Sequence, residues 1–272
     1  PLVHQIILWT TCDLSPGKEP IERALKTRIN PFEVNVSEII SSLTQVPLLS
    51  TIMRISPIPD FEIETLLTSV RAAILFNLKK LTETSRLVCE GQQNDMDFSL
   101  VKEVLEEDYF NMIENKTAVL IGCCYMFGGI VSDLNTKDIN ILYEVGKNLG
   151  IAFQLEDDLL DSFGNEAKFG KKIGGDIIEQ KKTLLFIFTQ AKLNGNQRVE
   201  FENIFFSDEI QEAVKINSIK TYYESSGAVD YLKNKVQEYS INAEKLINQM
   251  QIDTNKKLEL IKFSEKLLNR EI

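Results

Sequence analysis

Apolar residues recur at steps of three and four along most of the chain, which is the spacing of one face of an α-helix. One such stripe consists of Leu232, Val236, Tyr239, Ala243, Leu246 and Met250. The same spacing predicts helices near residues 61–90, 100–134, 136–164, 176–193, 208–225 and 254–270, separated by short polar breaks. No segment of useful length alternates apolar and polar positions, and residues 10–60 are the least regular part. We therefore expect an all-α protein with a single domain over residues 1–272.

Composition narrows the possible functions. The chain has 272 residues and a net charge of -10, which argues against a nucleic-acid-binding surface, so a phosphate ligand would have to be held locally. Four cysteines without a CxxC pair and a single histidine, His4, favour neither a thiol-metal site nor a disulfide framework, and a cytoplasmic location is expected. We find no signal peptide and no run long enough to span a membrane. The chain starts at Pro1 rather than methionine, which is compatible with a further segment upstream of this sequence.

The stretch FQLEDDLLD places four acidic residues within the six positions from Glu156 to Asp161. Asp157 and Asp161 are four residues apart, so a helix directs both carboxylates to one face, with Asp158 beside them. No basic residue occurs between Lys147 and Lys168 to balance this charge. A hard cation such as Mg²⁺ would neutralise the cluster and bridge it to phosphate oxygens. A solvated acidic helix face is the alternative interpretation.

Basic residues follow this acidic cluster closely. The segment KFGKKIGGDIIEQKKTLL contains Lys171, Lys172, Lys181 and Lys182. Such cations suit the outer oxygens of a metal-bridged polyphosphate, although each lysine alone is more typical of an exposed loop or a helix end. Upstream, EGQQNDMDF adds further polar groups, and a predicted helix after it carries ENKTAVL.

Five motifs in this order, GQQNDM, NKTAVL, GIAFQLEDDLLD, GKKIGGDI and KKTLL, resemble the trans-isoprenyl diphosphate synthases, the polyprenyl synthetase family. The resemblance implies a helical bundle around a deep apolar cavity, the isoprenoid synthase type of fold. It implies a homodimer or a heteromer with a related synthase subunit. It also implies Mg²⁺ and a prenyltransferase reaction that joins the homoallylic isopentenyl diphosphate to an allylic diphosphate.

The resemblance also assigns roles to individual residues. The expected metal ligands are Asp95, Asp157, Asp158 and Asp161. The expected diphosphate-binding residues are Gln92, Lys116, Lys171 and Lys181. The expected catalytic residues are Gln154, which the family places near the allylic C1, together with Lys116, Thr117 and Lys181.

One family motif is not visible. Members carry a first aspartate-rich motif upstream of GQ, followed by an arginine pair, but no two acidic residues are adjacent between Pro1 and Val88, and no two arginines are adjacent there. Pro1 can align with the end of the family's early GGKxxRP stretch, or LVHQIILWTTCDLS can align with the first aspartate-rich region itself; either alignment leaves that metal site without carboxylates. Three functions stay open: a prenyltransferase, a catalytically weak subunit that regulates a complete synthase, and a terpene synthase-like lyase.

Overall fold

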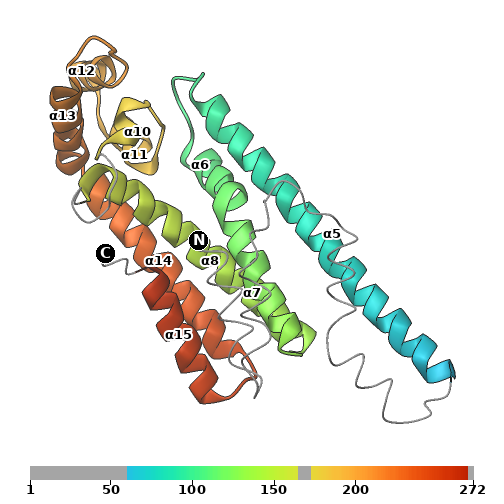
Figure 1. The fold of residues 1–272 in the computed structure, drawn as a ribbon. Coiled ribbons are helices and arrows are strands. Elements are labelled where there is room, and N and C mark those ends of the chain that lie inside the picture. Colours follow the sequence, from blue (N-terminus) through green and yellow to red (C-terminus); the bar gives the residue numbers. More distant parts are fainter. Residues whose placement is uncertain (1–59, 165–172, 269–272) are drawn as a thin grey trace. The chain divides into compact units, whose positions relative to one another are not determined.

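The computed structural model describes residues 60–164 and 173–268, with side chains from Asn77 onward. Every regular element in these ranges is a helix, which confirms the all-α prediction (Figure 1). The elements are α5 (Asp60–Phe98), α6 (Glu106–Ile113), the π-helical turn η1 (Glu114–Ala118), α7 (Val119–Val131), α8 (Thr136–Phe163), α10 (Gly175–Ile178), α11 (Leu184–Lys192), α12 (Gly195–Phe205), α13 (Glu212–Ser225), α14 (Ala228–Gln249) and α15 (Thr254–Leu268). None of these helices is long and apolar enough to cross a membrane.

The chain divides into two compact units. Residues 80–272 belong to the larger unit, and residues 11–79 form the other. The described part of the smaller unit is the first part of α5. The single-domain prediction stays a prediction, and the site lies wholly in the larger unit.

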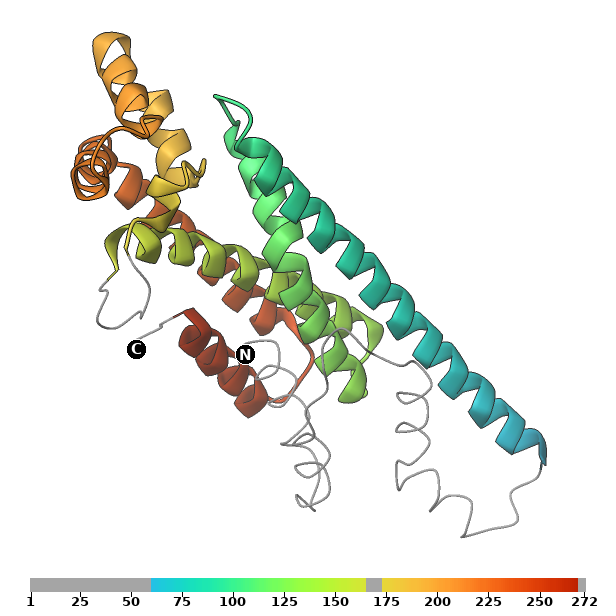
Figure 2. The ribbon, with the colours of Figure 1, turned by 45° about the horizontal axis from the view of Figure 1, so that its top comes forward.

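Helix α8 is central to the larger unit, since both α7 and α14 pack along it (Figures 1 and 2). Its start is set locally, because the Asn135 side-chain oxygen accepts a hydrogen bond from the Asp138 backbone N–H at 2.9 Å. Val145, Leu149 and Leu155 form part of its fully buried side. Burial of this stripe fixes the rotation of α8, and therefore the direction of the polar residues further along it.

An aromatic cluster holds α11 and α12 together. The ring centroids of Phe186 and Phe205 lie 4.3 Å apart and those of Phe186 and Phe201 lie 5.4 Å apart, and all three side chains are fully buried. Buried aromatic side chains contribute large apolar areas to stability. This cluster anchors α11, which begins at Leu184, two residues after Lys182.

The helix boundaries differ from the prediction at several places. Helix α5 continues to Phe98, beyond its predicted end near residue 90. Residues 100–105, predicted to be helical, belong to the non-helical connection 99–105 between α5 and α6. The predicted helix 176–193 is interrupted at residues 179–183. Helix α12, Gly195–Phe205, was missed because its first residues lie in the polar stretch LNGNQ, which indicated a break.

Candidate active site

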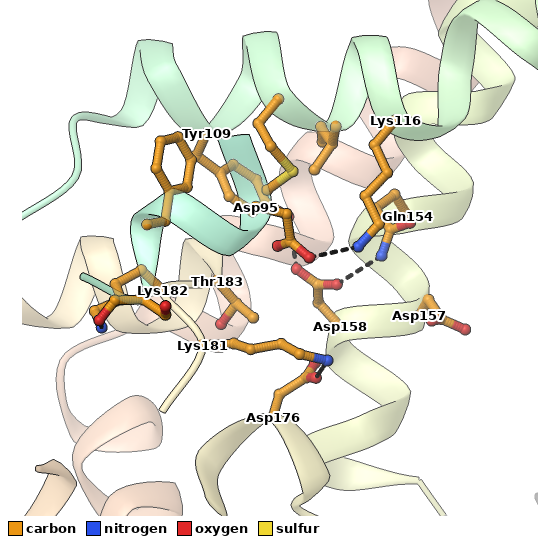
Figure 3. A pocket seen from close by; sticks show the side chains of 14 residues that line it. Asp95, Tyr109, Lys116, Gln154, Asp157, Asp158, Asp176, Lys181, Lys182 and Thr183 are labelled. Carbon is orange, nitrogen blue, oxygen red and sulfur yellow. Dashed lines mark hydrogen bonds and ion pairs between the residues drawn. The ribbon is translucent and has the colours of Figure 1, made fainter. Parts of the chain in front are cut away.

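Four segments distant in sequence meet at one cavity of about 210 Å³ (Figure 3). Its lining consists of Asp95, Phe98, Ser99, Tyr109, Met112, Ile113, Lys116, Gln154, Asp157, Asp158, Asp176, Lys181, Lys182 and Thr183. The apolar members come from α5 and α6, while most charged members come from α8 and the segment before α11. The cavity therefore has an apolar wall beside a strongly charged one.

Lys116 and Thr117 lie on the π-helical turn η1. Such turns inside helices occur frequently at functional sites. Two glycines allow neighbouring helices to contact this turn. A Cβ on Gly91 would lie 2.3 Å from the Lys116 backbone nitrogen, and a Cβ on Gly150 would lie 2.5 Å from the Ala118 Cα. The close approach brings α5 and α8 within side-chain reach of η1.

Both predicted phosphate-binding lysines that the structure describes are paired with carboxylates. Lys116 Nζ lies 2.7 Å from Asp95 Oδ2, and Lys181 Nζ lies 2.7 Å from Asp176 Oδ1 and 3.0 Å from Glu179 Oε2. Burial by itself would lower the pKa of Lys181, but its hydrogen bonds to Asp176 and Glu179 raise that pKa above its usual value. The Lys181 ammonium group is therefore charged at neutral pH.

Asp158 is almost fully buried, with 5% of its surface exposed. Tyr109 Oη donates to its Oδ2 at 2.6 Å, and Gln154 Nε2 donates to its Oδ1 at 3.0 Å (Figure 3). Burial raises the pKa of Asp158 to about 7 and the nearby Asp176 charge adds to this rise, while the two hydrogen bonds oppose it. Burial, followed by the Asp158 charge, raises the pKa of Tyr109 in turn.

The other two aspartates of FQLEDDLLD have different surroundings. Asp157 lines the cavity and projects from α8 in another direction than Asp158 (Figure 3). Asp161 lies about one turn further along, where its Oδ1 accepts the Asp176 backbone N–H at 2.9 Å. Burial raises the pKa of Asp161. The acidic cluster that looked uniform in sequence is thus divided among three local environments.

The structure brings together most of the predicted site. Six predicted residues line the cavity: Asp95, Lys116, Gln154, Asp157, Asp158 and Lys181. Thr117 Oγ1 donates to Gln154 Oε1 at 2.9 Å. Gln92 is exposed on α5 and does not line the cavity, and Lys171 lies outside the described residues. The roles assigned to these residues stay predictions.

Several cavity residues had no predicted role, among them Asp176, Tyr109 and Lys182. Asp176 belongs to the motif GGDI, where an acid between glycines and lysines was a signal that could have been used. Tyr109 is 49 positions from Asp158, and nothing local in sequence indicates their contact. Lys182, noted only as a neighbouring cation, is buried and donates to the Ser99 carbonyl oxygen at 3.4 Å; burial lowers its pKa.

The donor set suits a magnesium ion that arrives with a phosphate ligand. Among the described residues, no three acidic, histidine or cysteine side chains are grouped closely enough to hold a metal ion by themselves. Mg²⁺ commonly binds through one or two carboxylates, several waters and substrate phosphates rather than a complete protein cage. The carboxylate oxygens at this cavity match that chemistry, and two predicted ligands of the α8 cluster, Asp157 and Asp158, line it.

Comparison with known proteins agrees with this arrangement. The sequence profile described as Polyprenyl synthetase matches residues 61–222. Geranylgeranyl diphosphate synthase of Methanosarcina mazei is 30% identical over 211 residues, 78% of this chain and 63% of that protein. A solved geranylgeranyl pyrophosphate synthase is 35% identical with a TM-score of 0.68, over 73% of this chain and 62% of that one. Polyprenyl synthase from Caulobacter crescentus CB15, complexed with calcium and isoprenyl diphosphate, is 26% identical with a TM-score of 0.67, over 75% of this chain and 62% of that one.

The chain spans less than two thirds of the length of these relatives. The matched region contains all five motifs on which the resemblance was based. The matches confirm the all-helical isoprenoid synthase fold. The profile covers more than half of the chain, and the chain therefore belongs to the polyprenyl synthetase family.

Proposed function

We propose that this chain is a prenyltransferase that condenses isopentenyl diphosphate with an allylic diphosphate. The observation that carries the proposal is the charged wall of one cavity, where Lys116, Lys181 and Asp157 lie beside an apolar wall. In the reaction, the bond between the allylic C1 and its diphosphate oxygen breaks. The homoallylic double bond then forms the new carbon–carbon bond to C1, and a proton leaves.

Each group has a proposed task in this reaction. Lys116 and Lys181 donate to oxygens of the departing diphosphate, which requires them to leave their present carboxylate partners. Asp157, together with Asp95, would hold Mg²⁺ against the diphosphate. The ion would supply charge neutralisation for the leaving group. Met112 and Ile113 in the apolar wall would keep water from the positively charged carbon.

The test is product formation by the purified chain. It is incubated with isopentenyl diphosphate, Mg²⁺ and either dimethylallyl or farnesyl diphosphate, and products are identified by mass spectrometry. We expect a longer prenyl diphosphate, and we expect Asp157→Ala to reduce its rate at least about a hundredfold, which corresponds to about 2.7 kcal/mol of transition-state stabilisation. Turnover that is unaffected by Asp157→Ala would contradict the proposed role of this cavity.

A catalytically weak subunit is the second candidate, because the sequence carries no adjacent acidic pair and no arginine pair upstream of GQ. This alternative predicts no turnover by the chain alone. It also predicts that adding the chain changes the stability or product length of a complete synthase from the same organism. Turnover by the isolated chain would exclude it.

A further inference from the structure

A chain of three hydrogen bonds crosses from α6 through α8 to η1. Tyr109 Oη and Gln154 Nε2 donate to the two carboxylate oxygens of Asp158, at 2.6 and 3.0 Å. Gln154 Oε1 then accepts from Thr117 Oγ1 at 2.9 Å. Both Asp158 oxygens therefore already accept hydrogen bonds from protein donors, and only 5% of the residue is exposed.

The Gln154 amide can turn either its oxygen or its NH₂ group toward a given neighbour. A neighbour that can bind only one of these two groups fixes the orientation. The amide oxygen and the NH₂ group have similar shapes but opposite hydrogen-bonding character. The Thr117 hydroxyl can donate to the oxygen or accept from the NH₂ group, so it is compatible with either orientation. An ionised Asp158 carboxylate only accepts, so it requires the NH₂ group to face it.

We propose that Asp158 is a positioning residue rather than a metal ligand, and that it sets the orientation of the Gln154 amide at the cavity. Its two oxygens are engaged by Tyr109 and Gln154, whereas Asp157 projects from α8 in another direction (Figure 3). The inference rests on the proposed function, in which Gln154 borders the reacting carbon. A fixed amide presents a constant dipole to the positive charge that develops there.

The first test separates positioning from metal binding. Binding of inorganic diphosphate with Mg²⁺ is measured by calorimetry under the same conditions for wild type and two variants. Asp158→Asn keeps the shape of the side chain and is compared with Asp157→Asn, which removes the same charge one position away. We expect Asp157→Asn to weaken binding about tenfold or more and Asp158→Asn to change it less than about threefold. An equal loss in both variants would overturn the proposal.

The second test observes the amide directly. The side-chain NH₂ signals of Gln154 are followed by NMR in protein labelled with ¹⁵N-glutamine and are assigned with Gln154→Glu. We expect Asp158→Asn to shift or broaden these signals, because asparagine can both donate and accept. Thr117→Val should leave the two NH₂ proton signals separate and sharp, because the hydrogen bond from Gln154 to Asp158 is retained. Unchanged signals in Asp158→Asn, or their loss in Thr117→Val, would overturn the proposal.

These measurements also separate this inference from the proposed function. If the wild-type chain neither binds magnesium diphosphate nor forms product, the proposed function fails, while the Gln154 signals still decide whether Asp158 orients the amide. If product forms, we expect Asp158→Asn to reduce kcat about tenfold with KM for the allylic diphosphate unchanged. A rise in KM with kcat unchanged would indicate a role in substrate binding and contradict positioning.

Discussion

Lys116 on η1 and Asp95 on α5 form an ion pair, with Nζ and Oδ2 2.7 Å apart, at the wall of the cavity. The first is a predicted ligand of diphosphate and the second a predicted ligand of its metal ion. Without either ligand they neutralise each other. Diphosphate alone must therefore compete with Asp95 for Lys116, whereas diphosphate with Mg²⁺ offers a new partner to both residues.

This competition predicts that Asp95→Asn binds inorganic diphosphate more tightly than wild type when EDTA removes divalent ions. We expect about a fivefold gain, or about 1 kcal/mol, because Lys116 loses a competing carboxylate. Calorimetry measures the affinity. Asp97→Asn is the matched control, since Asp97 is exposed on the same helix and does not line the cavity. A gain of the same size in the control would attribute the effect to net charge alone.

Gln180 precedes Lys181 and adopts a φ of 55°, in the left-handed region that residues other than glycine rarely occupy. Gln180→Gly removes this strain, and we expect it to increase the free energy of unfolding by about 1 kcal/mol. The substitution also removes the hydrogen bond from Gln180 Nε2 to Asp208 Oδ1 at 2.8 Å. Gln180→Ala loses that hydrogen bond but keeps the strain. Urea denaturation should therefore give a higher free energy of unfolding for Gln180→Gly than for Gln180→Ala. Equal stabilities would rule out a strained turn.

Gly150 allows α8 to lie directly against the end of η1. A Cβ at this position would lie 2.5 Å from the Ala118 Cα, so Gly150→Ala should reduce the free energy of unfolding by about 2 kcal/mol. Asn140→Ala is the control, because Asn140 is exposed on the same helix. Urea denaturation of both variants measures the difference. A Gly150→Ala protein as stable as the control would show that the two helices can move apart without a loss of stability.

Lys215 is 3% exposed, and its Nζ donates to the Ser207 carbonyl oxygen at 3.0 Å. Burial lowers the pKa of Lys215, partly opposed by the Asp208 charge. The folded protein thus binds fewer protons here than the unfolded chain between the lowered pKa and about 10.4, and this residue's contribution to stability increases as pH rises through that window.

Lys215→Met removes this titration. We expect the free energy of unfolding of the variant, relative to wild type, to be highest near neutral pH and to fall as the pH approaches about 10. Unfolding in urea at several pH values measures this difference, and Lys220→Met on the same helix provides the control. A difference that does not change with pH would show that the Lys215 pKa is not lowered.

Some of this architecture depends on local interactions that a sequence displays. The predicted helix 136–164 agrees closely with α8, because the Asn135 cap and the apolar stripe lie within the segment itself. Residues 100–105, within the connection 99–105, were wrongly predicted as helix for the opposite reason. Val101, Val104 and Leu105 have helical spacing. However, the Ser99 carbonyl oxygen accepts a hydrogen bond from Lys182, just before α11, and the Lys102 carbonyl oxygen accepts one from Gln190 within α11.

The sequence by itself determined the helical class, the family and six residues that line the cavity, since apolar periodicity and ordered motifs are properties of the linear chain. Only the tertiary structure separated the three aspartates of FQLEDDLLD, because neighbouring positions on a helix point in different directions and meet different partners. Tyr109 reaches Asp158 across 49 positions, and Asp95 reaches Lys116 across 21. Such contacts depend on how the helices pack, and packing is decided by the core as a whole.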